Sequence, residues 1–270
     1  MRYASNSDLI DPSVGQGCRA FLSLGHDEYW DARQFESVRA LRDRPAAEGG
    51  GMSLCFLSGN SVCWVSPLTE NLRTLGRRGR YGDLSHAGAK DSIEQFGPFP
   101  LVGNPDEGLL MGARNALTGI MGGGDWRCET PKHWLFAGTG MKRGETIAGL
   151  VGWEFHADPP TPAELPGLLV VGCGEAFGAF ENPPVAQPWM ATVYYPSAGS
   201  EEELLHEDEA TSPTRPFCFD ASTIFWSQGL STPPGHALPW PHVVRPHGPD
   251  PRAQRMTRNL LDRALAVQNE

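Results

Sequence analysis

The chain has 270 residues, of which 40% are hydrophobic and 20% are charged, and its formal net charge at pH 7 is −10. This composition supports a folded core and excludes an intrinsically disordered chain. The acidic balance argues against nucleic acids and anionic membranes as partners, because both reward a basic surface. The 32 glycines and 24 prolines exclude a helical bundle or a coiled coil and predict many turns and long connections.

The sequence carries no sign of export or of a membrane span. No uncharged apolar run reaches the length of a membrane-spanning helix, and the polar N-terminus lacks the order of a signal peptide. We therefore expect a soluble, cytoplasmic protein. The six cysteines form neither a CxxC pair nor a disulfide framework, which predicts mostly buried, reduced thiols.

Two apolar runs near the N-terminus, residues 19–25 and 51–58, have the length of buried strands. Between them, Asp31 is a suitable N-cap for a helix whose hydrophobic residues recur at three-residue spacing before a group of arginines. The pattern predicts a strand–helix–strand unit with parallel strands. Gly25 and Gly59, which follow the two strands, should then open onto one cleft at the carboxyl edge of the sheet.

Further strands are expected in the second half of the chain. Residues 147–156 give the next strong strand pattern, which is apolar until close to its end. Shorter strand-like runs lie at 168–171, 190–195 and 222–226, and the last of them is rich in β-branched and aromatic residues. Together these runs extend the predicted α/β sheet.

The remaining segments predict one terminal helix and two loop regions. Asp250 caps an amphipathic helix that closes the chain. We interpret residues 70–145 as a loop-rich insertion and the acidic stretch 200–215 as a surface loop. The whole chain, residues 1–270, is expected to form a single α/β domain.

Two short segments echo each other after the first two predicted strands. Gly25-His-Asp-Glu-Tyr-Trp30 and Gly59-Asn-Ser-Val-Cys-Trp64 place Tyr29 and Cys63 at the same offset from a glycine, each followed by tryptophan. The echo predicts that the two loops are structural counterparts.

Three groups that can carry negative charge follow predicted strands: the phenol of Tyr29, the thiol of Cys63 and the carboxyl of Glu154. If one cleft collects them, they repel one another unless a cation lies among them. Phenolate and carboxylate oxygens favour iron, as Fe(III), or manganese over zinc, although the thiol softens this preference. The sequence therefore predicts a metal site, with iron as the first choice and another divalent metal as the alternative.

Three further residues could move protons at such a site: His26, Glu28 and His156. A metal that acidifies water and polarises a carbonyl, together with these groups, predicts hydrolysis. Structural explanations stay open for the same residues, since His26 and Glu28 can cover the sheet edge and cap a helix. Cys63 can equally be a small buried hydrophobe, and Glu154 can form an ordinary ion pair.

Several common catalytic motifs are absent. The sequence contains no G-x-S-x-G elbow, no phosphate-binding G-x-x-x-x-G-K-[ST] loop and no well-placed G-x-G-x-x-G turn. A serine hydrolase and a nucleotide-binding enzyme are therefore not indicated.

Four segments spread over the chain carry a family resemblance: Gly25–Trp30, Leu57–Trp64, Gly149–Glu154 and Ala221–Trp226. Over nearly its whole length the chain resembles the large (beta) subunit of N,N-dimethylformamidase and its relatives. The resemblance implies a glutamine-amidotransferase-like core, a three-layer, flavodoxin-like α/β fold with a mostly parallel sheet. In the amidase itself it implies a mononuclear iron held by two tyrosines and one glutamate.

Carried over residue by residue, the resemblance matches Tyr29 to the ligand of the His-x-Glu-Tyr-Trp motif and Glu154 to the carboxylate. The second tyrosine, expected in the G-N-x-x-Tyr-Trp loop, is Cys63 in this chain. The resemblance thus implies a metal-dependent amidohydrolase acting on small linear amides, with Cys63 as an altered ligand.

Two other functions remain open at this point, a thiol hydrolase with Cys63 as the nucleophile and a non-catalytic binding or structural relative. Relatives usually have a substantial region before the segment at which this chain begins. We therefore expect an N-terminally truncated core, with a second copy or a partner subunit completing it.

Overall fold

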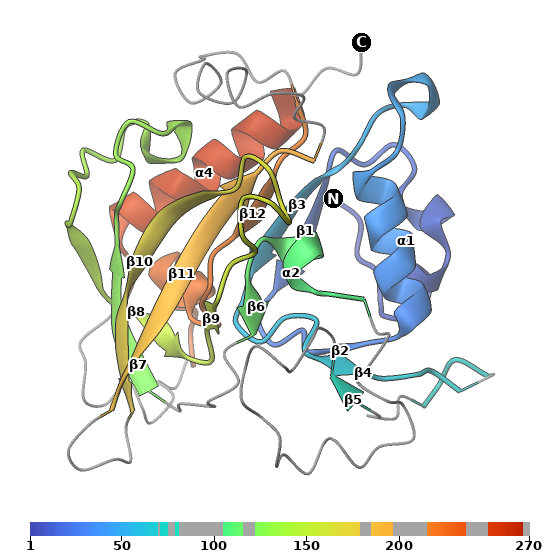
Figure 1. The fold of residues 1–270 in the computed structure, drawn as a ribbon, viewed down its shortest axis with the longest axis horizontal. Helices are drawn as coiled ribbons and strands as arrows, with labels where there is room; N and C mark the ends of the chain where they lie inside the picture. Colours follow the sequence, from blue (N-terminus) through green and yellow to red (C-terminus); the bar gives the residue numbers. More distant parts are fainter. Residues whose placement is uncertain are drawn as a thin grey trace.

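A seven-stranded mixed sheet organises the protein, with strand order β1-β3-β12-β11-β10-β7-β8 (Figure 1). The computed structural model describes residues 1–69, 71–74, 79–80, 105–115, 122–178, 185–196, 215–235 and 248–266. The strands of this sheet are β1 (Ala20–Leu24), β3 (Ser53–Leu57), β7 (Gly122–Arg127), β8 (Thr146–Trp153), β10 (Leu169–Gly178), β11 (Ala186–Tyr194) and β12 (Cys218–Asp220).

Two small sheets and several helices complete the described fold. The small sheets pair β2 (Tyr29–Trp30), β4 (Trp64–Val65) and β5 (Gly79–Arg80), and separately β6 (Arg114–Asn115) with β9 (His156–Ala157). The α-helices are α1 (Ala32–Arg42), α2 (Gly108–Met111) and α4 (Pro251–Ala266). The 3-10 turns are η1 (Asp8–Ile10), η2 (Pro12–Gly15), η3 (Ala46–Glu48), η6 (Trp134–Phe136) and η7 (Trp226–Gly229).

The predicted strand–helix–strand unit at the N-terminus is confirmed. β1 and β3 pair in parallel on either side of the connecting helix α1. Asp31 caps α1, since its side chain accepts a hydrogen bond of 2.8 Å from the backbone N–H of Arg33. The carboxyl ends of both strands therefore lie at the same edge of the sheet.

The α/β class is confirmed, but parallel pairing is limited to one half of the sheet. β3 pairs in parallel with β1 and with β12, whereas the pairs from β12 through β11, β10 and β7 to β8 are antiparallel. Only residues 179–185 separate β10 from β11, too few for the crossover connection that a parallel pair requires. The sheet is therefore mixed.

Both faces of the sheet are covered, and the side chains of β3 contribute to a separate hydrophobic cluster on each face. All five of its side chains are buried, with Leu54 and Phe56 in one hydrophobic cluster and Cys55 and Leu57 in another. The first cluster includes side chains of α1 and α2, and the second includes side chains of α4. Figure 1 shows α4 and α1 on opposite sides of β1, β3 and β12. The continuous apolar pattern of β3 follows from this double burial.

The expected strand at 222–226 is wrong, because the strand β12 ends at Asp220 and a turn follows it. Ser222 has a left-handed backbone with φ of 56°, and its hydroxyl donates to the carbonyl of His156. The hydroxyl of Thr223 donates to the carbonyl of Leu150. These side chains bond to a neighbouring backbone, which favours a turn over continued strand pairing.

The other predicted elements of the second half are present with shifted bounds. The run at 147–156 divides into β8 and β9, and Glu154 lies in the turn between them. The runs at 168–171 and 190–195 lie in the longer strands β10 and β11, and α4 confirms the terminal helix.

The two predicted loop regions are described only in part. Within the segment 70–145, which sequence analysis treats as an insertion, β7 is a strand of the main sheet and η6 contacts α4. Most of the acidic stretch 200–215 lies outside the described residues. Among the described helices, none has the length and apolar character needed to cross a membrane. None of the six cysteines, all of which lie in the described residues, forms a disulfide, and four of them are buried, as predicted.

A close backbone approach fixes the end of β3 against the turn after β8. A Cβ atom at Gly59 would lie 2.1 Å from the carbonyl oxygen of Glu154. We predict that Gly59→Ala lowers the free energy of unfolding by about 3 kcal/mol, because the backbone must move to relieve this overlap. Urea denaturation measures the loss.

The matched control is Gly144→Ala. Gly144 has φ of 85°, and no described atom lies within 4 Å of an added Cβ, so this variant carries only the conformational penalty of about 1 kcal/mol. Equal losses in the two variants would show that the approach at Gly59 adds no cost.

Candidate functional site

Two loops run side by side after the carboxyl ends of β1 and β3, as their sequence echo predicts. β2 pairs in parallel with β4, with Tyr29 opposite Trp64. The backbone N–H of Trp64 donates to the carbonyl of Glu28 at 2.8 Å, and the hydroxyl of Ser58 donates to the carbonyl of Gly25. Figure 1 shows this small sheet beyond the ends of β1 and β3. The two loops therefore form one site.

Three side chains converge where these loops meet the turn after β8. The candidate ligand atoms of His26, Glu28 and Glu154 all lie within 4.8 Å of one another. His26 Nε2 is 3.4 Å from Glu28 Oε2 and 3.8 Å from Glu154 Oε2. The side chain of His26 is 49% exposed, whereas those of Glu28 and Glu154 are 6% and 21% exposed. The cluster of His26, Glu28 and Glu154, here called the carboxylate–histidine cluster, is thus exposed to solvent at His26 and buried at Glu28.

The two carboxyl groups of the cluster oppose each other's ionisation. Burial, followed by the neighbouring carboxylate of Glu28, raises the pKa of Glu154 to about 8. Without a cation, Glu154 therefore holds its proton at neutral pH. Among the described residues, the buried Oε2 of Glu154 has no hydrogen-bond partner. A buried carboxyl oxygen without a donor is costly, and a bound cation would supply the missing interaction.

Tyr29 and Cys63, the other two predicted metal ligands, do not belong to this cluster. Tyr29 is half-buried, and the centroid of its ring is 5.9 Å from that of His26, so it borders the cluster. Cys63 is only 2% exposed, and it is not a member of the group of ligand atoms that the described residues bring together. The structure therefore joins Glu154 with the predicted acid–base residues His26 and Glu28.

His156, also predicted as an acid–base residue, lies in the protein interior. Its side chain and that of Asp220 are both 0% exposed, and Nδ1 of His156 is 2.6 Å from Oδ2 of Asp220. Its Nε2 accepts a hydrogen bond of 3.1 Å from the backbone N–H of Ser61. Burial raises the pKa of Asp220, and the contact with His156 opposes this shift. Both ring nitrogens are therefore occupied by internal partners.

Sequence reasoning missed two polar residues at this site. Asp220 follows the apolar run of β12 directly, which is the same signal that identified Glu154. Asn60 lies in the second loop, and its Nδ2 donates to Oε1 of Glu28 at 3.0 Å. Its position directly after Gly59 could have indicated a role, since Gly59 follows a buried strand.

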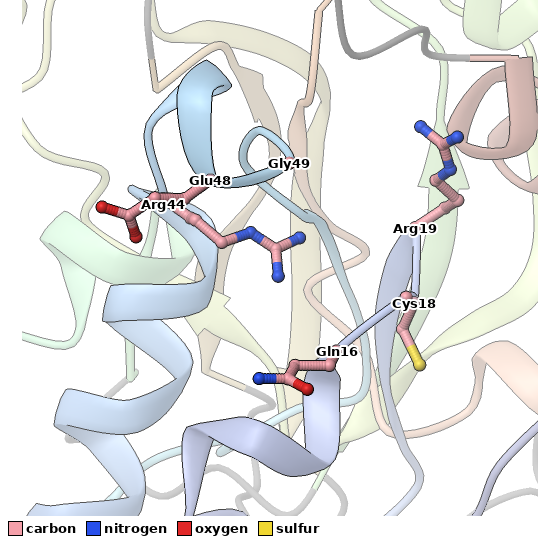
Figure 2. Close-up of a pocket in the computed structure, with 7 residues that line it drawn as sticks. Gln16, Cys18, Arg19, Arg44, Glu48 and Gly49 are labelled. Atoms are coloured by element: carbon pink, nitrogen blue, oxygen red, sulfur yellow. The ribbon is translucent and has the colours of Figure 1, made fainter.

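A separate cavity lies at the other end of the sheet, where β1 begins. Its volume is about 510 Å³, and it is lined by Gln16, Gly17, Cys18, Arg19, Arg44, Glu48 and Gly49 (Figure 2). The guanidinium groups of Arg19 and Arg44 do not converge on one point in this view. The cavity shares no residue with the carboxylate–histidine cluster, which lies beyond the other end of β1.

Comparison with known proteins gives one result that bears on the site. A sequence model of the family described as "N,N-dimethylformamidase beta subunit-like, C-terminal" matches residues 1–239. Comparison with curated proteins found no match. The matched region contains both loops, the whole carboxylate–histidine cluster and the buried pair of His156 and Asp220.

The raised pKa of Glu154 predicts a pH-dependent stability of the metal-free protein. Between its ordinary pKa of 4.5 and the folded value of about 8, the unfolded chain loses the proton of Glu154 while the folded chain retains it. Wild-type stability therefore falls as the pH rises through this window. We predict that, in the presence of a chelator, Glu154→Gln is more stable than wild type at pH 8.5 by roughly 1–3 kcal/mol.

Urea denaturation at pH 4.5 and pH 8.5 tests this prediction, and the advantage of the variant should disappear at the lower pH. Glu164→Gln is the control with the opposite sign. A backbone hydrogen bond from Thr161 lowers the pKa of Glu164, so its ionised form contributes stability above pH 4.5 that falls away in more acidic solution. Equal stability of wild type and Glu154→Gln at pH 8.5 would indicate ordinary ionisation of Glu154.

Proposed function

This chain belongs to the N,N-dimethylformamidase beta subunit-like family, and from that premise we propose that it hydrolyses the C–N bond of small linear amides with a bound cation. One observation carries the proposal: the ligand atoms of two carboxyl groups and an imidazole lie within 4.8 Å of one another, and Oε2 of Glu154 has no hydrogen-bond partner among the described residues. A scattered arrangement, which a non-catalytic relative would show, does not fit these distances.

The donor set fits a cation that prefers oxygen and imidazole ligands. We propose that Glu28 and Glu154 hold the cation and that Tyr29, which borders the cluster, supplies a third ligand. Such donors suit iron, with another divalent metal as the alternative. Cys63 is not part of this proposed set, because its thiol is buried and outside the cluster.

A bound cation supplies Lewis acidity, which polarises the amide carbonyl and lowers the pKa of water. The protein's own contribution begins with His26, which is half-exposed at the opening of the cluster. His26 can accept a proton from the attacking water and return it to the leaving nitrogen as the C–N bond breaks. The carboxylate of Glu28, 3.4 Å from Nε2, orients the imidazole. The products are a carboxylic acid and an amine.

Family membership also supports two proposals, one about the partner of this chain and one about its fold. Because the family is described as beta subunit-like, we propose that the chain works with a partner subunit or a second copy of itself. We further propose that the parallel half of the sheet, β1-β3-β12 with α1, corresponds to the amidotransferase-like core.

Metal analysis and a visible spectrum of the purified protein test the proposed function. We expect stoichiometric iron, a visible band from tyrosinate bound to Fe(III), and release of dimethylamine from N,N-dimethylformamide. Tyr29→Phe should remove the band, and Glu154→Ala should lower metal affinity and activity by about 100-fold. Tyr3→Phe is the matched control, because Tyr3 is 90% exposed near the N-terminus.

Two results would contradict the proposal. A metal-free protein with full activity would show that no cation is needed. Loss of turnover on alkylation of Cys63, with no effect of chelators, would identify a thiol hydrolase instead.

A further inference from the structure

The loop that joins β3 to β4 has a strained backbone next to the carboxylate–histidine cluster. Asn60 has φ of 52° and Val62 has φ of 54°, both in the left-handed region that non-glycine residues rarely adopt. The strain is greatest for Val62, because its side chain is β-branched. Such conformations persist only where the surrounding structure fixes them, and they gather at functional sites.

The peptide groups between these two residues are fixed by buried partners. The N–H of Ser61 donates to Nε2 of His156 at 3.1 Å, and the carbonyl of Ser61 accepts from Nδ2 of Asn115 at 3.2 Å. The N–H of Val62 donates to the carbonyl of Asp27 at 3.0 Å. The loop is therefore held from three other segments of the chain.

His156 is itself held in one orientation. Because its Nε2 accepts the N–H of Ser61, its proton lies on Nδ1 and is donated to the carboxylate of Asp220 at 2.6 Å. The N–H of Ser222 donates to the same carboxylate at 2.8 Å. The hydroxyl of Ser222 accepts from the backbone N–H of His156 at 3.0 Å. The pair of His156 and Asp220 is thus rigid, buried and fully hydrogen-bonded.

The held loop presents the amide of Asn60 to the cluster. Its Nδ2 donates to Oε1 of Glu28 at 3.0 Å. Through this bond the second loop holds one carboxyl group of the cluster, and the place of the amide depends on the backbone of the loop.

We propose that Asn60 is a positioning residue for the carboxyl group of Glu28, which lies in one cluster with Glu154. We further propose that the buried pair of His156 and Asp220 holds Asn60 in place through Ser61. The role of His156 is thus to shape the loop, while His26 moves protons. This inference deepens the proposed function and rests on it for its activity readout.

The first experiment needs no activity. Nitrogen-15 NMR of histidine-labelled, metal-free protein should show His156 as the Nδ1-protonated tautomer, with an unprotonated Nε2. The amide proton of Ser61 should exchange slowly, and it should lose this protection when the pair is replaced by His156→Met with Asp220→Leu. A His156 protonated on Nε2 would overturn the inference.

The second experiment is a mutant cycle on kcat/KM for N,N-dimethylformamide. Asn60→Gly accepts a φ of 52° without strain, so its stability should not fall, while kcat/KM should fall on the order of 100-fold. The His156→Met and Asp220→Leu pair removes both buried polar partners together, which limits the folding penalty. Adding Asn60→Gly to this pair should cause little further loss, because the pair already releases the amide.

The control and the remaining outcomes separate this inference from the proposed function. Asn71→Gly, in an exposed turn, should leave kcat/KM unchanged. Losses that multiply in the combined variant, or full activity of Asn60→Gly, would overturn the positioning role. Wild type could hydrolyse no amide and still show the expected tautomer and the protected Ser61 amide. The proposed function would then be wrong, whereas the inference that His156 and Asp220 hold the loop between β3 and β4 would be supported.

Discussion

The site depends on the repulsion between two neighbouring carboxyl groups that the fold forces together. Glu28 follows β1 and Glu154 follows β8, so strands from both edges of the sheet deliver them to one place. Burial strengthens the repulsion, since less water screens it, and Glu154 responds by retaining a proton. The amide of Asn60, which donates to Glu28 at 3.0 Å, offsets part of the same charge.

Holding two carboxyl groups close together costs free energy, and the rigid backbone around them keeps them in place. Gly59 lets the end of β3 contact the carbonyl of Glu154, and the buried pair of His156 and Asp220 fixes the next loop. A strained loop and a fully hydrogen-bonded interior pair thus support each other. The backbone beneath the side chains of the cluster is therefore held in place.

The local parts of this structure could be predicted from the sequence, because their causes are local. The buried run of β3, the capped helix α1 and the paired loops all follow from patterns within about ten residues. The antiparallel half of the sheet could not be derived in this way, since pairing partners lie far apart in the sequence. The strand expected at 222–226 failed because side-chain hydrogen bonds outweighed β propensity.

The same limit applies to the site. Strand ends correctly indicated where polar groups gather, and they brought Glu28 and Glu154 into view. They could not tell which way a side chain points, so the interior position of His156 emerged only from the three-dimensional arrangement. One further consequence follows from β12, the only described strand of the main sheet with a parallel neighbour on one side and an antiparallel neighbour on the other. Asp220 ends this strand and accepts from His156, so one buried carboxylate joins the boundary between the two halves of the sheet to the loop beside the carboxylate–histidine cluster.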